Sequence, residues 1–203
     1  MIDSTLSWND QSVSLASKLN KACYAIRMVK SCMSWEVLSM IYFSYVHSIM
    51  AYGIIFWGNS HSSGTIFKIQ KKIIRLINNS DRRESCRKLF KELQILPLAS
   101  QYILSILVFV NKNRGLFLSN SDVHNINTRY NLNLHVPSTK LTIVQKGVLY
   151  SGSRIFGCLT LRIKCWESSD VKGFKFTIKK YLMEHTFYSL EEYFQFHWLL
   201  FLF

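Results

Sequence analysis

The chain has 203 residues, of which 49% are apolar and 18% are charged, so it can bury a sizeable core and is not a disordered tail. Its 25 Lys and Arg residues outnumber 12 Asp and Glu residues, and the net charge of +13 indicates nucleic acid or a membrane surface as the partner. Five scattered cysteines without a CxxC pair give no disulfide framework, and the start of the chain lacks the apolar stretch of a secretory signal, so we expect an intracellular protein, nuclear or cytoplasmic.

Helical periodicity dominates the sequence and predicts a mainly α fold. The first predicted helix is amphipathic, and the second is apolar on almost every side, with Ser34 as its N-cap, so it should be central. Pro97 separates a short helix from a longer apolar one, and Ser189 with Glu192 forms a capping box that opens one further turn near the end. We expect helices near residues 12–31, 34–52, 65–78, 84–93, 98–111 and 170–185.

The third of these helices is strongly basic. Residues 37–67 contain no charged side chain other than His, and then Lys68, Lys71, Lys72 and Arg75 follow within an arc of about 100° on a helix. The segment from residue 68 to residue 91 contains nine basic and two acidic residues, so more than half of the net charge lies in it. We predict that these four cations contact nucleic-acid phosphates, assisted by Arg82, Arg83, Arg87 and Lys88, although a merely solvated helix face has the same pattern.

The apolar segment before the basic helix raises the question of a membrane. Residues 37–57 are long enough to span a bilayer, but Ser39, Ser44, His47 and Gly53 dilute their hydrophobicity. A buried helix is therefore the favoured interpretation and a membrane the less favoured partner. The alternative is a small membrane-anchored protein with the basic helix at the cytoplasmic surface.

The regularity of the sequence changes after Gly115. Residues 115–146 are rich in Asn and Ser and show little periodicity, and clear helical spacing returns near residue 170. We therefore predict a helical region at 1–114, a less regular C-terminal region at 115–194, and an apolar tail at 195–203 that resembles an aberrant extension.

No catalytic constellation is recognisable. Two-metal chemistry needs clustered carboxylates, and the only neighbouring acids, Glu191 and Glu192, belong to the predicted capping turn. The sequence also contains no phosphate-binding glycine loop, no GxSxG and no HExxH. Cys158, Cys165, His124 and His135 match no usual zinc spacing, so we favour buried or idle thiols and expect no catalytic residue, metal or cofactor.

Several runs of residues resemble one known family. They are LNKACYAIRMVKS (19–31), IYFSYVHSIMAYGIIFWGNS (41–60), IFKIQKKIIRLI (66–77), LPLASQYI (96–103), INTRYNLNLH (126–135), QKGVLYSGSRIF (145–156) and FYSLEEYF (187–194). Together they are similar to the region downstream of the catalytic palm in arthropod non-LTR retrotransposon reverse transcriptases of the jockey-like type. Residues 1–8 resemble the end of the strand and turn that follow that palm.

The resemblance implies a fragment of an RNA-directed DNA polymerase. Region 1–114 would be the thumb, a helical module that grips the template-primer duplex by its backbone, and region 115–194 the post-thumb segment. The catalytic aspartates and the Mg²⁺ that they hold would belong to the missing palm. At Cys158, Leu159 and Thr160 the family usually has Asn-Leu-Pro, which suggests a decayed copy. Apolar surfaces once covered by the palm would be exposed, so a protein-interaction module used by a host is a further alternative.

Overall fold

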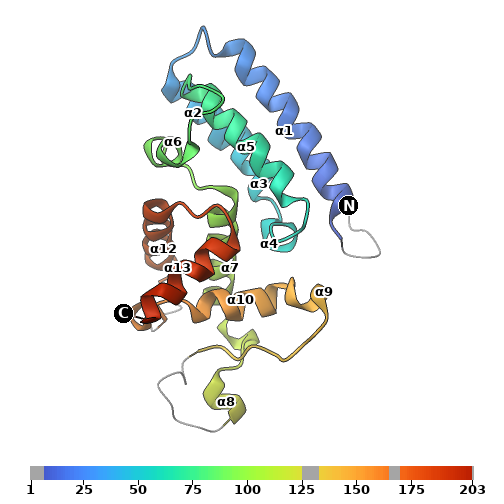
Figure 1. Ribbon diagram of the computed structural model, residues 1–203, viewed down its shortest axis with the longest axis vertical. Coiled ribbons are helices and arrows are strands. Elements are labelled where there is room, and N and C mark those ends of the chain that lie inside the picture. Colours follow the sequence, from blue (N-terminus) through green and yellow to red (C-terminus); the bar gives the residue numbers. More distant parts are fainter. Residues whose placement is uncertain (1–6, 125–132, 165–169, 203) are drawn as a thin grey trace.

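The computed structural model describes residues 7–124, 133–164 and 170–202, and the chain is mainly α-helical over these residues, as predicted (Figure 1). No strand occurs within the described ranges, where one isolated antiparallel bridge joins Ser119 to Leu134. The six predicted helices are confirmed to within three residues at each end. The predicted division at residue 115 stays a prediction.

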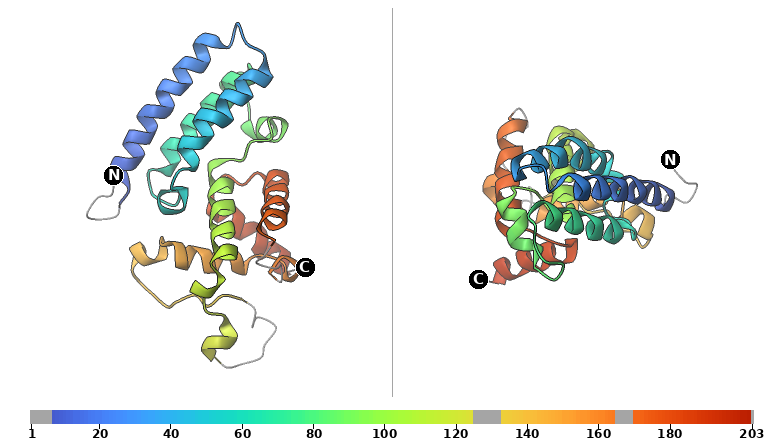
Figure 2. Two further views of the ribbon diagram at one scale, coloured as in Figure 1. Left: turned by 180° about the vertical axis from the view of Figure 1, so that it is seen from behind. Right: turned by 90° about the horizontal axis from the view of Figure 1, so that it is seen from above.

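The N-terminal half is built from three long helical rods that lie side by side (Figures 1 and 2). Helix α1 (Asn9–Val29) packs along α5 (Ser63–Ile77), and the third rod consists of α2 (Trp35–Ile41), the π-helical segment η1 (Tyr42–His47) and α3 (Ser48–Ala51). The stripe of α1 that contains Leu19 and Ile26 is buried against these neighbours. The hydrophobic periodicity of α1 therefore fixes which of its faces enters the core.

The third rod is helical as predicted, but its middle is π-helical. The Ser44 hydroxyl donates to the carbonyl of Ile41 at 3.3 Å, and the Ser48 hydroxyl donates to the carbonyls of Ser44 and Tyr45 at 2.7 and 2.9 Å. Such side-chain bonds to the preceding turn compete with the regular α-helical pattern. The rod ends at Gly53, whose φ of 60° favours glycine, and α4 (Ile54–Trp57) follows.

The segment considered as a membrane span, residues 37–57, is thus divided among four successive helical pieces. Within the described residues, none of the helices combines the length and the apolar character that crossing a bilayer requires.

A single buried amide joins α5 to its neighbours. The side-chain nitrogen of Gln70 donates to the Tyr42 hydroxyl and to the Leu96 carbonyl, both at 2.9 Å, and its oxygen accepts from the Leu98 amide at 2.9 Å. Gln70 is 1% exposed, and all of these partners lie in the core. Its hydrogen bonds therefore fix the position of α5 relative to η1 and to the start of the next long helix.

That next helix, α7 (Leu98–Lys112), connects the two halves of the molecule. It is preceded by α6 (Cys86–Glu92) and by Pro97, and it is apolar on most sides because helices pack around it. Helix α10 (Val148–Gly157) and helix α12 (Val171–His185) both lie against it. A Cβ at Gly152 would lie 2.9 Å from Val110, so glycine permits the close approach of α10.

The C-terminal region is more helical than its sequence predicted. Among the described residues between α7 and α10, the helical pieces are short: η2 (Arg114–Leu116), α8 (Asn120–His124) and α9 (Thr142–Gln145). Helix α11 (Leu161–Lys164) follows α10. The expectation of only one further turn after Ser189 was wrong, because α13 (Leu190–Leu202) continues through most of the apolar tail. Its residue His197 is buried and lies 2.9 Å from the Tyr181 hydroxyl, so packing against α12 supports the longer helix.

Candidate nucleic-acid interface

The basic helix predicted from the sequence is α5, and its apolar side is buried. Ile66, Ile73 and Ile74 are fully buried, whereas Leu76, which the periodicity placed on the buried side, is only half-buried. The buried arc is shifted toward Ile74 because α5 contacts α1, α6 and α7 as well as the third rod. Lys68 and Lys72 lie on the opposite side and are exposed.

The four cations of α5 fall into two pairs. Lys68 and Lys72 have no hydrogen bond or ion pair with any residue of the described ranges, so both ammonium groups are free to meet an anion. Lys71 and Arg75 are half-buried at the seam between α5 and α6. The Lys71 ammonium lies 4.7 Å from the centre of the Phe67 ring and 5.7 Å from that of Tyr188, which places it over two aromatic faces.

Arg75 is bound to the loop that follows α5. Its Nε and Nη2 donate to the Glu84 carbonyl at 3.0 and 2.8 Å. In the same loop, the Asp81 carboxylate accepts a hydrogen bond from the Arg83 amide at 2.8 Å, a local turn that leaves the Arg82 and Arg83 side chains exposed. Among the described residues no acidic group pairs with either guanidinium.

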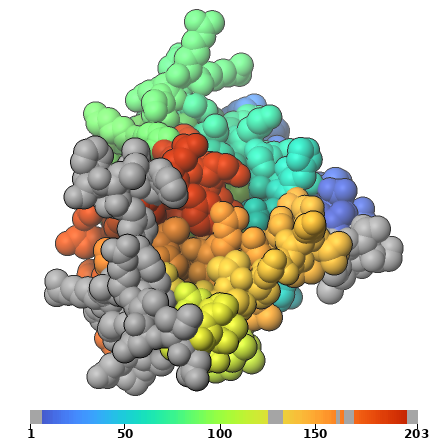
Figure 3. Space-filling view, turned by 60° about the horizontal axis from the view of Figure 1, so that its bottom comes forward, coloured from blue at the N-terminus to red at the C-terminus, as the bar shows by residue number. Residues whose placement is uncertain are grey.

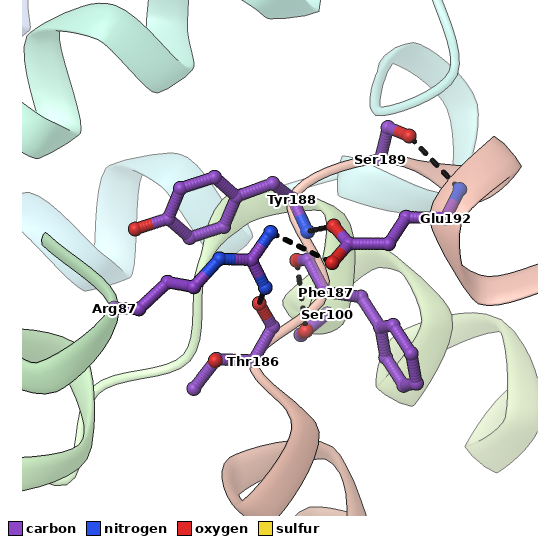
Figure 4. A network of polar contacts seen from close by, with 7 residues as sticks. All are labelled: Arg87, Ser100, Thr186, Phe187, Tyr188, Ser189 and Glu192. Carbon is purple, nitrogen blue, oxygen red and sulfur yellow. Dashed lines mark hydrogen bonds and ion pairs between the residues drawn. The ribbon is translucent and has the colours of Figure 1, made fainter. Parts of the chain in front are cut away.

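Arg87 belongs to a network that joins α6 to the C-terminal region (Figure 4). Its guanidinium lies 2.7 Å from the Glu192 carboxylate, donates to the Thr186 carbonyl at 3.2 Å, and stacks 4.3 Å from the centre of the Tyr188 ring. The neighbouring Lys88 is exposed and lies 3.6 Å from Glu92 one turn later. Arg87 is therefore held in a structural network, whereas Lys88 has only an exposed ion pair.

The predicted capping box lies in the same network. The Ser189 hydroxyl accepts a hydrogen bond from the Glu192 amide at 3.1 Å, which confirms the serine half of the box. The Glu192 carboxylate accepts from the amide of Tyr188 at 2.8 Å rather than from that of Ser189. Glu192 thus caps α13 and neutralises Arg87 with its two oxygens.

Tyr188 was not predicted as a site residue from the sequence, although its ring lies beside two of the predicted cations, Lys71 and Arg87. Its ring packs edge-on against Phe67 at 4.9 Å and lies beside both Lys71 and Arg87. Burial raises the pKa of its hydroxyl to about 12, so the phenol is neutral near pH 7. In the sequence, Tyr188 is distinguished only by its position in the FYSLEEYF run.

The part of the chain that the structure describes contains no recognisable metal centre. In the described ranges there is no group of three or more His, Cys, Asp or Glu side chains that could hold an ion. The His124 and His135 rings lie 5.4 Å apart, and Cys165 lies outside the described residues. Burial raises the pKa of the Cys158 thiol, which donates to the Arg154 carbonyl at 3.6 Å and is therefore a protonated thiol near neutral pH.

Comparison with family models, with curated proteins and with solved structures found no match to this chain.

Proposed function

We propose that this chain is a catalytically silent fragment of a non-LTR retrotransposon reverse transcriptase that binds nucleic-acid backbones without sequence preference. The family assignment rests on the quoted sequence runs. The proposed binding to nucleic-acid backbones rests on one observation. Lys68 and Lys72 on α5 are exposed, and so are Arg82 and Arg83 in the loop after it.

The arrangement of α5 supports a rigid rather than an adaptable contact. Lys68 and Lys72 are one helical turn apart, and Gln70 between them is held by hydrogen bonds to three neighbours. Cations on a fixed helix can neutralise successive phosphates and release the counterions condensed on the duplex. Phosphate contacts position a protein on nucleic acid but carry no base information, so the proposed binding is non-specific.

Duplex binding by a charge-deleted variant tests the proposal. Lys68→Gln with Lys72→Gln removes the two α5 cations that have no described partner, and the matched control, Lys175→Gln with Lys179→Gln, removes two exposed lysines at the same spacing on α12. Fluorescence anisotropy with two duplexes of unrelated sequence should show equal weakening on both for the α5 variant and near wild-type affinity for the control. Equal duplex affinity of the two variants would show that Lys68 and Lys72 are merely solvated and do not contact the duplex.

A protein-interaction module is a second candidate, and one observation favours it. Large apolar side chains are exposed on the N-terminal rods, including Tyr24 at 63%, Met28 at 60% and Met40 at 63%. Apolar surface of this kind marks protein contacts when it is contiguous. A separately expressed palm domain of the parent family should then bind the chain, and Tyr24→Ser with Met40→Ser should weaken that binding without changing duplex affinity.

A further inference from the structure

A pocket of about 360 Å³ lies away from the basic side of α5. It is formed where three segments meet, namely the start of α1, the turn after α4, and the residues that join α9 to α10. Figure 3 shows this side of the molecule, with residues near 140–148 in gold against the teal and blue N-terminal segments. Its volume falls within the range of small-molecule sites, roughly 300 to 1,000 Å³.

An aromatic pair forms one wall of this pocket. The rings of Trp8 and Phe56 stack at 5.9 Å with an interplanar angle of 22°, and Phe56 is 52% exposed. Ile143, which is 50% exposed, contributes an apolar surface from α9. Phe56 lines the pocket, and an exposed aromatic ring of this kind, stacked on a second one, provides a platform on which a flat ligand ring can continue the stack.

The start of α1 is fixed in place beside this platform. Trp8 adopts a left-handed backbone conformation, with φ at 61°, which is unusual for a bulky residue. The Asn9 side-chain oxygen accepts a hydrogen bond from the Ser62 hydroxyl at 2.9 Å, which joins α1 to the residue before α5. Strain of this kind persists only where the surrounding structure holds it, and it is concentrated at functional sites.

The polar residues of the pocket define the chemistry of its ligand. Asn59 offers both donor and acceptor groups, and His61 and Lys146 are exposed bases. The described part of its lining contains no Asp or Glu. A ligand that matches this lining combines a flat, hydrogen-bonding ring with a negative charge.

We propose that this pocket binds a nucleotide, with the base stacked on Phe56 and the phosphate near Lys146. The proposal does not depend on the contacts of α5 with duplex, because Lys68 and Lys72 do not line the pocket. The nucleotide can be a free mononucleotide or an unpaired nucleotide within a strand, since both present the same base and phosphate.

Calorimetric titration of the full chain with AMP, adenosine and ribose 5-phosphate tests the chemistry. Stacking of one base is worth roughly 1–3 kcal/mol, so Phe56→Ala should weaken AMP binding about 5- to 150-fold. Lys146→Glu should weaken AMP more than adenosine. The control is Tyr52→Ala, since this side chain is 78% exposed and does not line the pocket, and its AMP affinity should equal that of the wild type.

Three results would overturn the proposal. They are an unchanged AMP affinity in Phe56→Ala, binding of ribose 5-phosphate as tight as that of AMP, and equal binding of adenosine and AMP by the wild type. A parallel titration with an eight-nucleotide single-stranded RNA distinguishes a free mononucleotide from an unpaired nucleotide within a strand. It is carried out in the Lys68→Gln/Lys72→Gln background. Tighter binding of the strand than of AMP, lost in Phe56→Ala, assigns the pocket to an unpaired nucleotide, and equal binding assigns it to free nucleotide.

Discussion

The guanidinium of Arg75 donates two hydrogen bonds to the backbone carbonyl of Glu84, nine residues later in the chain. These bonds hold the end of α5 to the loop that carries Arg82 and Arg83. Arg75 was predicted as a phosphate contact, and its position at the seam gives it a structural role in addition to its charge.

We therefore expect Arg75→Gln to lower the free energy of unfolding by about 1–3 kcal/mol, because hydrogen bonds from a charged donor are lost. Urea denaturation monitored by circular dichroism measures this change. The matched control is Lys72→Gln, an exposed position three residues earlier, where the change should stay within about 0.5 kcal/mol. Equal stability of the two variants would contradict a structural role for Arg75.

Gln70 is expected to be among the most sensitive positions in the chain. Gln70→Ala leaves the Tyr42 hydroxyl, the Leu96 carbonyl and the Leu98 amide without their partner in the core, which should cost at least about 3 kcal/mol. Tyr42→Phe removes only one of these bonds and should cost about 1 kcal/mol. Thermal unfolding should rank the two variants in this order, and the reverse order would show that the amide is not the central link.

Stability should also depend on the protonation of His197. Burial, followed by the nearby His185 and Lys164, lowers the pKa of its imidazole from 6.5 to about 4. The unfolded chain therefore binds this proton more readily than the folded chain, so the stabilisation is present above pH 6.5 and is lost as the pH falls toward 4. Urea midpoints at pH 7 and pH 5 should differ more for the wild type than for His197→Gln, and equal differences would contradict this assignment.

Polymerase activity is not expected from this chain. A purified sample should fail to extend a primed RNA template with either Mg²⁺ or Mn²⁺, because two-metal chemistry needs a set of clustered carboxylates that the sequence does not indicate. Incorporation of labelled nucleotides is the measurement. Extension that depends on added metal would contradict the proposal of a silent fragment.

The sequence predicted the helices that carry a clear apolar stripe. It did not predict helices whose existence or length depends on tertiary contacts. Helix α10 was missed because small residues, Ser151, Gly152 and Ser153, make up part of its buried side and interrupt the apolar stripe that ends in Ile155 and Phe156. The extent of α13 was missed because its support comes from Tyr181, 16 residues before His197. Neither feature can be found from local periodicity alone.

In the candidate interface, too, local sequence patterns located the exposed cations but did not show which cations contact residues far away in the chain. Charge and helical spacing located Lys68 and Lys72, and both are exposed as predicted. The structural roles of Lys71 and Arg87 depend on Tyr188, which lies about a hundred residues further along the chain. No spacing rule connects such distant residues, so the sequence does not distinguish free cations from those with a partner.

The salt dependence of duplex binding tests the central claim most directly. If about four phosphates are contacted, log K should fall against log salt with a slope of roughly −3 to −4 for the wild type, and the slope should become shallower by about 2 in Lys68→Gln/Lys72→Gln. The Lys175→Gln/Lys179→Gln control should keep the wild-type slope. Identical slopes in the two variants, with both folded, would contradict the assignment of α5 as the nucleic-acid-binding helix.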